Sequence, residues 1–210
     1  MLLDLFEKSI LPKGITHIAG PPNSGKTTIL YHACKGLKKG SRALILDCEM
    51  NFSAQRLQEI LLGTEVKLDN ITIISLLEKT QQMKTVMKIH NFLTQTDYEF
   101  VAINGITDHF RSGNAEKGEI ELSKSLNLQL AFLQMITREY ATPILITNQV
   151  TAFKEGNKQT FRPIAESAIR NYIDREIALI HINRKYWKAI YENEEEYYTI
   201  TTRGIERVKN

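Results

Sequence analysis

Near the start of the chain stand the residues Gly20-Pro21-Pro22-Asn23-Ser24-Gly25-Lys26-Thr27, which match the pattern G-x-x-x-x-G-K-[ST] at every fixed position. A short β-branched run at 15–19 precedes them, and a helical pattern at 26–37 follows. A strand, a glycine-containing turn and a helix in this order form the setting that a phosphate-binding loop requires. The stretch therefore predicts a nucleoside triphosphate site in an α/β fold.

The residue types in the loop suit a phosphate chain. Glycines let the backbone curl so that its N–H groups face an anion, and the helix N-terminus adds about half a positive charge. Lys26 is expected to reach the β- and γ-phosphates, and the Thr27 hydroxyl to ligate Mg²⁺. The predicted ATP-binding set is Gly20, Pro21, Pro22, Asn23, Ser24, Gly25, Lys26, Thr27 and Thr28.

The rest of the chain alternates apolar runs with helical patterns. Further strands are expected at 43–46, 71–74, 100–103 and 143–147, and helices at 53–62, from Met83 to Leu93 and from Leu122 to Ile136. Most of these strands are continuously apolar, which favours a parallel sheet covered by helices on both faces. After Glu176 come strands at 177–182, 187–191 and 197–202, with a solvated turn at 192–196, so antiparallel strands are expected to extend the sheet. We expect residues 1–210 to form one domain.

Composition narrows the class of protein. With 42% hydrophobic and 24% charged residues, the 210-residue chain has the balance of a folded globular protein. No apolar run approaches the roughly 20 residues of a membrane span, and Asp4 and Glu7 interrupt the first apolar stretch, so a cytoplasmic protein is expected. The net charge of +3 permits a nucleic-acid partner without predicting one. Cys34 and Cys48 have no metal-ligand spacing and are expected to be buried.

The carboxylates around the predicted site are unusual. The acid that orients magnesium in P-loop proteins is expected after strand 100–103, but the chain has Asn104 there. An amide oxygen accepts a hydrogen bond from a metal-bound water but carries no charge. Thr27 and Asn104 are therefore the predicted metal residues, hydrolysis is expected to be slow, and Asn104→Asp is expected to speed it. Asp108, four residues beyond Asn104, is a weaker candidate for the role of the missing acid.

Glu49 is the candidate general base. It follows strand 43–46, from which a carboxylate can activate a water at the γ-phosphate. The spacing alone leaves open that Glu49 and Asp47 are only solvated residues at the end of a strand. His17 and His181 lie within expected strands and are interpreted as packed or hydrogen-bonded residues.

The segment 151–170 mixes cations with aromatic side chains. Such interleaving suits single-stranded nucleic acid, because bases stack on the rings while phosphates pair with the cations. A solvated loop with its aromatics turned to the core is the alternative. The residues concerned are Phe153, Lys154, Lys158, Phe161, Arg162 and Arg170.

Three stretches together resemble the RecA/RadA recombinase superfamily, and most closely its archaeal RadB-type RadA paralogues. They are Asp47-Cys48-Glu49-x-x-Phe52-x-x-Gln55-Arg56-Leu57, Asn104-Gly105-Ile106-Thr107 and Ile146-Thr147-Asn148-Gln149-Val150. The resemblance implies a RecA-type ATPase core in which Glu49 is the catalytic glutamate and Gln149 senses the γ-phosphate. It also implies that 112–119 and 151–170 are DNA loops, with Lys154, Lys158 and Arg162 as DNA-binding residues.

The resemblance implies a function as well. It is that of a weak ATPase, dependent on ATP and Mg²⁺, which regulates homologous recombination or DNA repair and contacts single-stranded DNA or a RadA-type recombinase. This chain departs from the family pattern at Asn104 and Gly105, where aspartate and serine are usual, and only 19 residues precede Gly20, so the family's N-terminal DNA-binding domain is expected to be absent. The alternatives are a P-loop small-molecule kinase and an adaptor that binds ATP without hydrolysing it.

Overall fold

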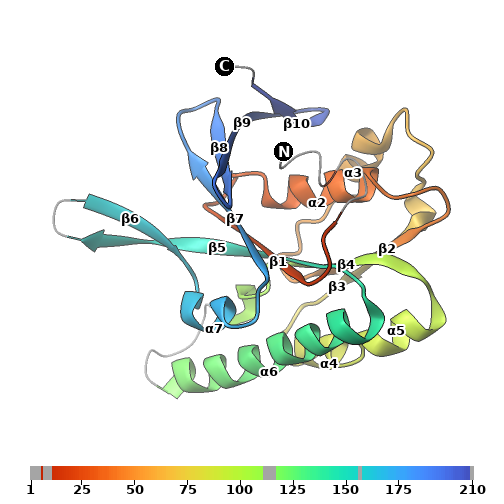
Figure 1. Cartoon of the computed structure of the whole chain (residues 1–210), viewed down its shortest axis with the longest axis horizontal. Helices are drawn as coiled ribbons and strands as arrows, with labels where there is room; N and C mark the ends of the chain where they lie inside the picture. The colour runs from red at the N-terminus through yellow and green to blue at the C-terminus, as the bar shows by residue number, and fades with distance from the viewer. Residues whose placement is uncertain (1–5, 7–10, 111–116, 156–157, 209–210) are drawn as a thin grey trace.

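The computed structural model describes residues 6, 11–110, 117–155 and 158–208; within these ranges, the side chains of 117–123, 153–155 and 158–159 are not described. Its centre is a twisted sheet in the order β10-β9-β8-β7-β1-β5-β4-β2-β3, with β6 paired to β5 outside this path (Figure 1). The strands are β1 (Ile15–Gly20), β2 (Arg42–Asp47), β3 (Ile71–Ser75), β4 (Tyr98–Asn104), β5 (Ile144–Glu155), β6 (Lys158–Pro163), β7 (Arg175–His181), β8 (Trp187–Tyr191), β9 (Glu194–Thr201) and β10 (Gly204–Arg207).

Helices cover both faces of the sheet. Figure 1 shows α2 and α3 on one face and α4, α5 and α6 on the other. The helices are α2 (Lys26–Lys35), α3 (Ala54–Leu61), α4 (Lys79–Val86), α5 (Ile89–Gln95), α6 (Lys117–Tyr140) and α7 (Glu166–Arg170), with 3₁₀ turns η1 (Leu68–Asn70) and η2 (Asp108–Phe110). Two apolar cores result, one under each helical layer, and Cys34 is buried in the first and Cys48 in the second.

The strand directions confirm the predicted fold class. β1 runs parallel to β5 and β7, and the parallel pairing continues through β4, β2 and β3. From β7 to β10 every pairing is antiparallel. Consecutive β2 residues, among them Leu44 and Ile45, are buried on opposite faces, one in each core. A strand covered by helices on both sides needs this continuous apolar pattern.

Three predicted boundaries were wrong. The helical stretch from Met83 to Leu93 is two helices, because the Lys88 N–H bonds to the Thr85 carbonyl and its ψ of 6° ends α4. The segment after residue 150 continues β5 and pairs with β6 as a hairpin. The solvated turn at 192–196 is shorter, because β9 already begins at Glu194 and its Glu195 and Glu196 pair with Lys188 and Arg207.

Other sequence predictions had mixed outcomes. His17 is buried, with Nδ1 3.2 Å from Glu176 Oε2, as expected for a hydrogen-bonded histidine. His181 is exposed, although its ring packs edge-on against Trp187 at 4.7 Å between centroids. Residues 112–116 of the predicted first DNA loop lie outside the described residues. None of the helices in the described part of the chain has the length and apolarity needed to span a membrane.

Candidate nucleotide site

The phosphate-binding loop joins β1 to α2, as its sequence predicts. Gly25 adopts a left-handed conformation with φ of +88°, which glycine tolerates better than any other residue. Lys26, the first residue of α2, is 5% exposed, and its Nζ donates to the carbonyls of Gly20 and Pro21, each at 2.9 Å. The ammonium group of Lys26 therefore lies against the phosphate-binding loop and is bonded to its first two residues.

A cavity of about 390 Å³ opens over this loop. It is lined by Pro22, Asn23, Gly25, Lys26, Thr27, Thr28, Glu49, Asn51, Gln149 and Ile200. The fold thus brings Lys26, Thr27, Glu49 and Gln149 to one cavity from α2, the end of β2 and β5. Of the remaining predicted residues, Gly20, Pro21, Ser24 and Asn104 do not line it, and neither does Asp108.

Asn104 lies beneath the cavity at the end of β4, fully buried, with all of its amide hydrogen-bonding capacity used. Its Oδ1 accepts from Thr27 Oγ1 at 3.3 Å and Thr147 Oγ1 at 3.0 Å. Its Nδ2 donates to Asp47 Oδ1 and Asn51 Oδ1, each at 2.8 Å. A flipped amide would set its oxygen against the Asp47 carboxylate, so the surroundings fix which atom faces Thr27.

Asp47 supplies a buried negative charge beside this amide. β2 and β4 pair in register, which puts Asp47 opposite Asn104. The second carboxylate oxygen of Asp47 accepts from the backbone N–H of Phe52 at 2.9 Å. Two donors therefore stabilise the charge of a side chain that is 2% exposed. The alternative that Asp47 is only a solvated residue at the end of a strand was wrong.

Glu49 stands at the edge of the cavity. Its Oε2 accepts from Asn51 Nδ2 at 2.7 Å, whereas its Oε1 is buried and has no hydrogen-bond partner among the described residues. The carboxylate packs over Gly105, whose φ is +77° and where any Cβ would overlap Cγ of Glu49. The glycine at the position where the family usually has serine is thus explained by close packing.

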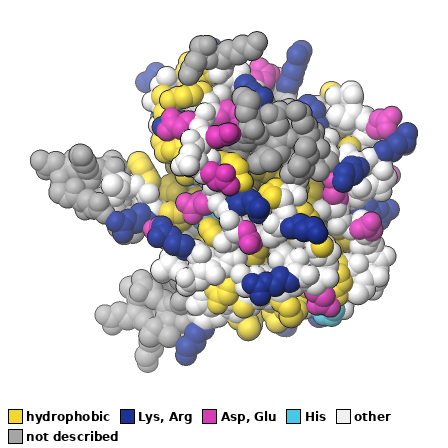
Figure 2. Space-filling model, in the orientation of Figure 1, with side chains coloured by type: hydrophobic (Ala, Val, Ile, Leu, Met, Phe, Trp, Pro, Cys, Tyr) yellow, Lys and Arg dark blue, Asp and Glu magenta, His cyan; other side chains and the backbone are white. Residues whose placement is uncertain are grey.

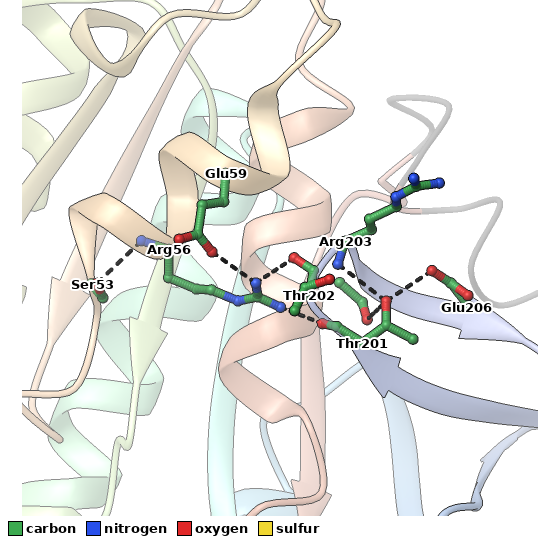
Figure 3. A network of polar contacts seen from close by, with 8 residues as sticks. Ser53, Arg56, Glu59, Thr201, Thr202, Arg203 and Glu206 are labelled. Carbon is green, nitrogen blue, oxygen red and sulfur yellow. Dashed lines mark hydrogen bonds and ion pairs between the residues drawn. The ribbon is translucent and has the colours of Figure 1, made fainter.

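The C-terminal strands form a further wall of the site. The Tyr198 hydroxyl donates to the Ser24 carbonyl in the phosphate-binding loop at 2.7 Å, and Ile200 lines the cavity. In Figure 3, the Arg56 guanidinium reaches from α3 to the carbonyls of Thr201 and Thr202. These contacts join residues more than 140 positions apart in the chain, and the sequence analysis identified neither Ile200 nor Asn51 as part of the site.

His32 fixes the same strands from α2. Its Nε2 accepts from the backbone N–H of Ile205 at 2.8 Å, so the bond requires an unprotonated ring nitrogen. Burial, assisted by the nearby charges of Lys35 and Arg56, lowers the pKa of His32 to about 4. The helix that begins at Lys26 is therefore bonded to β10 by a group whose protonation would break the bond.

The predicted nucleic-acid segment projects from the body as the β5–β6 hairpin (Figure 1). Phe161 is 58% exposed and Arg162 is exposed, whereas the side chains of Lys154 and Lys158 lie outside the described residues. Lys and Arg side chains lie beside the base of this projection on the face drawn in Figure 2. An apolar groove of about 570 Å³ separates the hairpin from β7 and β8, and its lining includes Pro22, Phe161, Pro163, Ile180 and Trp187.

The phosphate-binding loop after β1, the parallel strands and the antiparallel C-terminal extension define a RecA-type P-loop core. The family model for Rad51 matches residues 2–183, and the chain belongs to this family. Because the family is that of a recombinase core, the small-molecule kinase alternative is not favoured.

Several archaeal proteins are similar to this chain. The DNA repair and recombination protein RadB of Thermococcus sibiricus is 24% identical over 220 residues, covering 99% of this chain and 92% of the relative. The RadB protein of Methanobrevibacter smithii is 26% identical, covering 96% and 91%. That of Methanococcus maripaludis is 32% identical over 155 residues, covering 71% of this chain and 70% of the relative.

Proposed function

We propose that this protein binds ATP with Mg²⁺ in the cavity over the phosphate-binding loop, hydrolyses it slowly, and acts in DNA recombination or repair. The observation that carries the proposal is the meeting of Lys26 and Glu49, from α2 and from the end of β2, at one cavity. A cation for the phosphates and a residue that activates or orients the attacking water are two of the recurring groups in enzymes that transfer phosphoryl groups.

The polar groups present fit a magnesium ion. Mg²⁺ prefers oxygen ligands and is held mainly by phosphates and water, with one or two protein groups. The Thr27 hydroxyl is the direct ligand in this proposal, and the Asn104 amide oxygen, 3.3 Å from Thr27 Oγ1, is the acceptor that orients it. The ion would neutralise charge on the β- and γ-phosphates, and the buried carboxylate of Asp47 lies behind Asn104.

Lys26, Glu49 and Gln149 have separate roles in the proposed hydrolysis. Lys26 exchanges a bond to its own loop for one to the phosphates. The Glu49 carboxylate, which lines the cavity, accepts the proton of the attacking water. The bond between the γ-phosphorus and the β–γ bridging oxygen then breaks to give ADP and phosphate. Gln149, at the start of the β5–β6 hairpin, is the group that connects the γ-phosphate to that hairpin.

The hairpin is the proposed contact for single-stranded DNA. The exposed ring of Phe161 offers a base-stacking surface, and Arg162 with Lys154 and Lys158 offers cations. A RadA-type recombinase is the proposed protein partner, because the RadB proteins that are similar to this chain are DNA repair and recombination proteins. The cytoplasm is the proposed location.

Isothermal titration of ATP with Mg²⁺ tests the binding step. Loss of a charge-assisted hydrogen bond costs roughly 1.5–3 kcal/mol, so Lys26→Ala should weaken ATP binding about 10- to 150-fold. The matched control is Lys84→Ala, which removes an exposed lysine from α4 and should bind like the wild type. Equal affinity of Lys26→Ala and wild type would refute the assignment of the site. Tight binding without any phosphate release would instead favour the adaptor alternative.

A further inference from the structure

Asn51 connects the candidate base to the buried amide at the end of β4. Its Nδ2 donates to Glu49 Oε2 at 2.7 Å, and its Oδ1 accepts from Asn104 Nδ2 at 2.8 Å. The amide group of Asn51 therefore donates one of these hydrogen bonds and accepts the other. Since Asn104 is itself fixed by Asp47, a continuous chain of hydrogen bonds runs from a buried carboxylate to the one at the cavity.

We propose that Asn51 is a positioning residue that holds the Glu49 carboxylate for attack on the γ-phosphate, and that Asn104 acts chiefly as its anchor. The proposal rests on the proposed function, in which Glu49 is the base. It assigns Asn104 a role that an aspartate could not fill, because only an amide can donate to both Asp47 and Asn51. In this proposal, the asparagine that replaces the usual acid supports the position of Glu49 through Asn51.

The space for this arrangement is specific to the chain. Gly105 follows Asn104 directly, and its missing side chain leaves the position that Cγ of Glu49 occupies. Any larger residue at 105 would overlap Glu49 and would be strained at a φ of +77°. Two neighbouring departures from the family pattern, Asn104 and Gly105, therefore act on the same carboxylate, one through Asn51 and one by direct packing.

Three variants separate the contacts. Asn51→Leu keeps the shape and removes both bonds, whereas Asn51→Asp keeps an acceptor for Asn104 and removes the donor to Glu49. Each should lower kcat for ATP hydrolysis about 10- to 150-fold, the range for a hydrogen bond to a charged group, with ATP affinity unchanged by titration calorimetry. Gly105→Ala should also lower kcat, since its Cβ displaces Glu49. Asn91→Leu, an exposed asparagine on α5, is the control.

A double-mutant cycle between Asn51→Leu and Glu49→Gln distinguishes positioning from a general structural role. If Asn51 acts through Glu49, the free energies of unfolding without nucleotide should show coupling between the two sites, whereas kcat should fall in Asn51→Leu with ATP affinity unchanged. Wild-type kcat in Asn51→Leu, or additive losses in the cycle, would overturn the proposal. If Glu49→Gln itself left kcat unchanged, the proposed function would fail first, and the coupling measured by unfolding would still report on the contact.

Discussion

The amide of Asn104 donates to the carboxylate of Asp47 at 2.8 Å, and both side chains are buried at the ends of neighbouring parallel strands. This pairing decides what residue can stand at 104. A carboxylate there would face Asp47 without a shared proton or cation, and two carboxylates in contact disfavour each other's charged form.

Asn104→Asp should therefore destabilise the protein and leave hydrolysis no faster. The variant loses both bonds donated by Nδ2 and buries a second negative charge, so the free energy of unfolding should fall by at least about 2 kcal/mol. Urea unfolding measures the loss, and phosphate release measures the rate. This outcome reverses the expectation from sequence, in which restoring the acid speeds the reaction.

The control for this variant is Asn91→Asp, which makes the same change at an exposed position on α5. Its stability should stay within about 0.5 kcal/mol of wild type. An Asn104→Asp protein that is both as stable as wild type and faster would contradict the role given to the Asn104–Asp47 pair.

Stability should fall in acid because of His32. Its pKa lies near 4 in the folded protein and near 6.5 when unfolded, so below pH 6.5 the unfolded chain binds a proton that the folded one excludes. The part of the free energy of unfolding that depends on neutral His32 is fully present above pH 6.5. It is lost as the pH falls toward 4, to a limit of about 3 kcal/mol. Chemical unfolding across this range checks the slope.

His32→Gln keeps an acceptor for the Ile205 N–H but does not titrate, so its stability should vary less between pH 6.5 and 4. His181→Gln replaces an exposed histidine and should keep the wild-type slope. If stability changed with pH equally in His32→Gln and in the wild type, His32 would be excluded as the source of the pH dependence.

Binding of single-stranded DNA should depend on the β5–β6 hairpin and on salt. Two or three phosphate contacts on a single strand predict a log–log salt slope between about −1.4 and −2.1. Replacing Lys154 and Lys158 together by alanine should weaken binding and flatten this slope. Fluorescence anisotropy with a labelled oligonucleotide measures both quantities.

The matched control replaces Lys84 and Lys88 by alanine, two exposed lysines on and beside α4. This change alters the net charge equally but lies away from the hairpin in sequence and fold. If both double variants lose affinity alike, the hairpin is not the site and only the overall charge matters.

Local patterns predicted the parts of the fold that depend on neighbours in sequence. The loop from Gly20 to Thr27 and the continuously apolar strand after Arg42 are visible in the sequence because motif and burial leave a local signature. The partners of Asn104 are not, since Asp47 and Asn51 lie more than 50 positions away and come close only through the pairing of β2 with β4.

The wall formed by β9 and β10 was missed for the same reason. Nothing in the residues around Arg56 indicates that its guanidinium bonds to the Thr201 and Thr202 carbonyls, because a backbone acceptor has no sequence signal. The hairpin after residue 150 was also hidden, since its mixed polar and aromatic residues suit an exposed strand and a loop equally well.

Steady-state phosphate release with ATP and Mg²⁺, compared between wild type and Glu49→Gln, tests the central claim most directly. The account predicts that the wild type turns over more slowly than about 1 s⁻¹, the lower end of the usual range for enzymes. Glu49→Gln should show no measurable turnover and should bind ATP as tightly as the wild type in calorimetry. A Glu49→Gln protein that releases phosphate as fast as the wild type would contradict it.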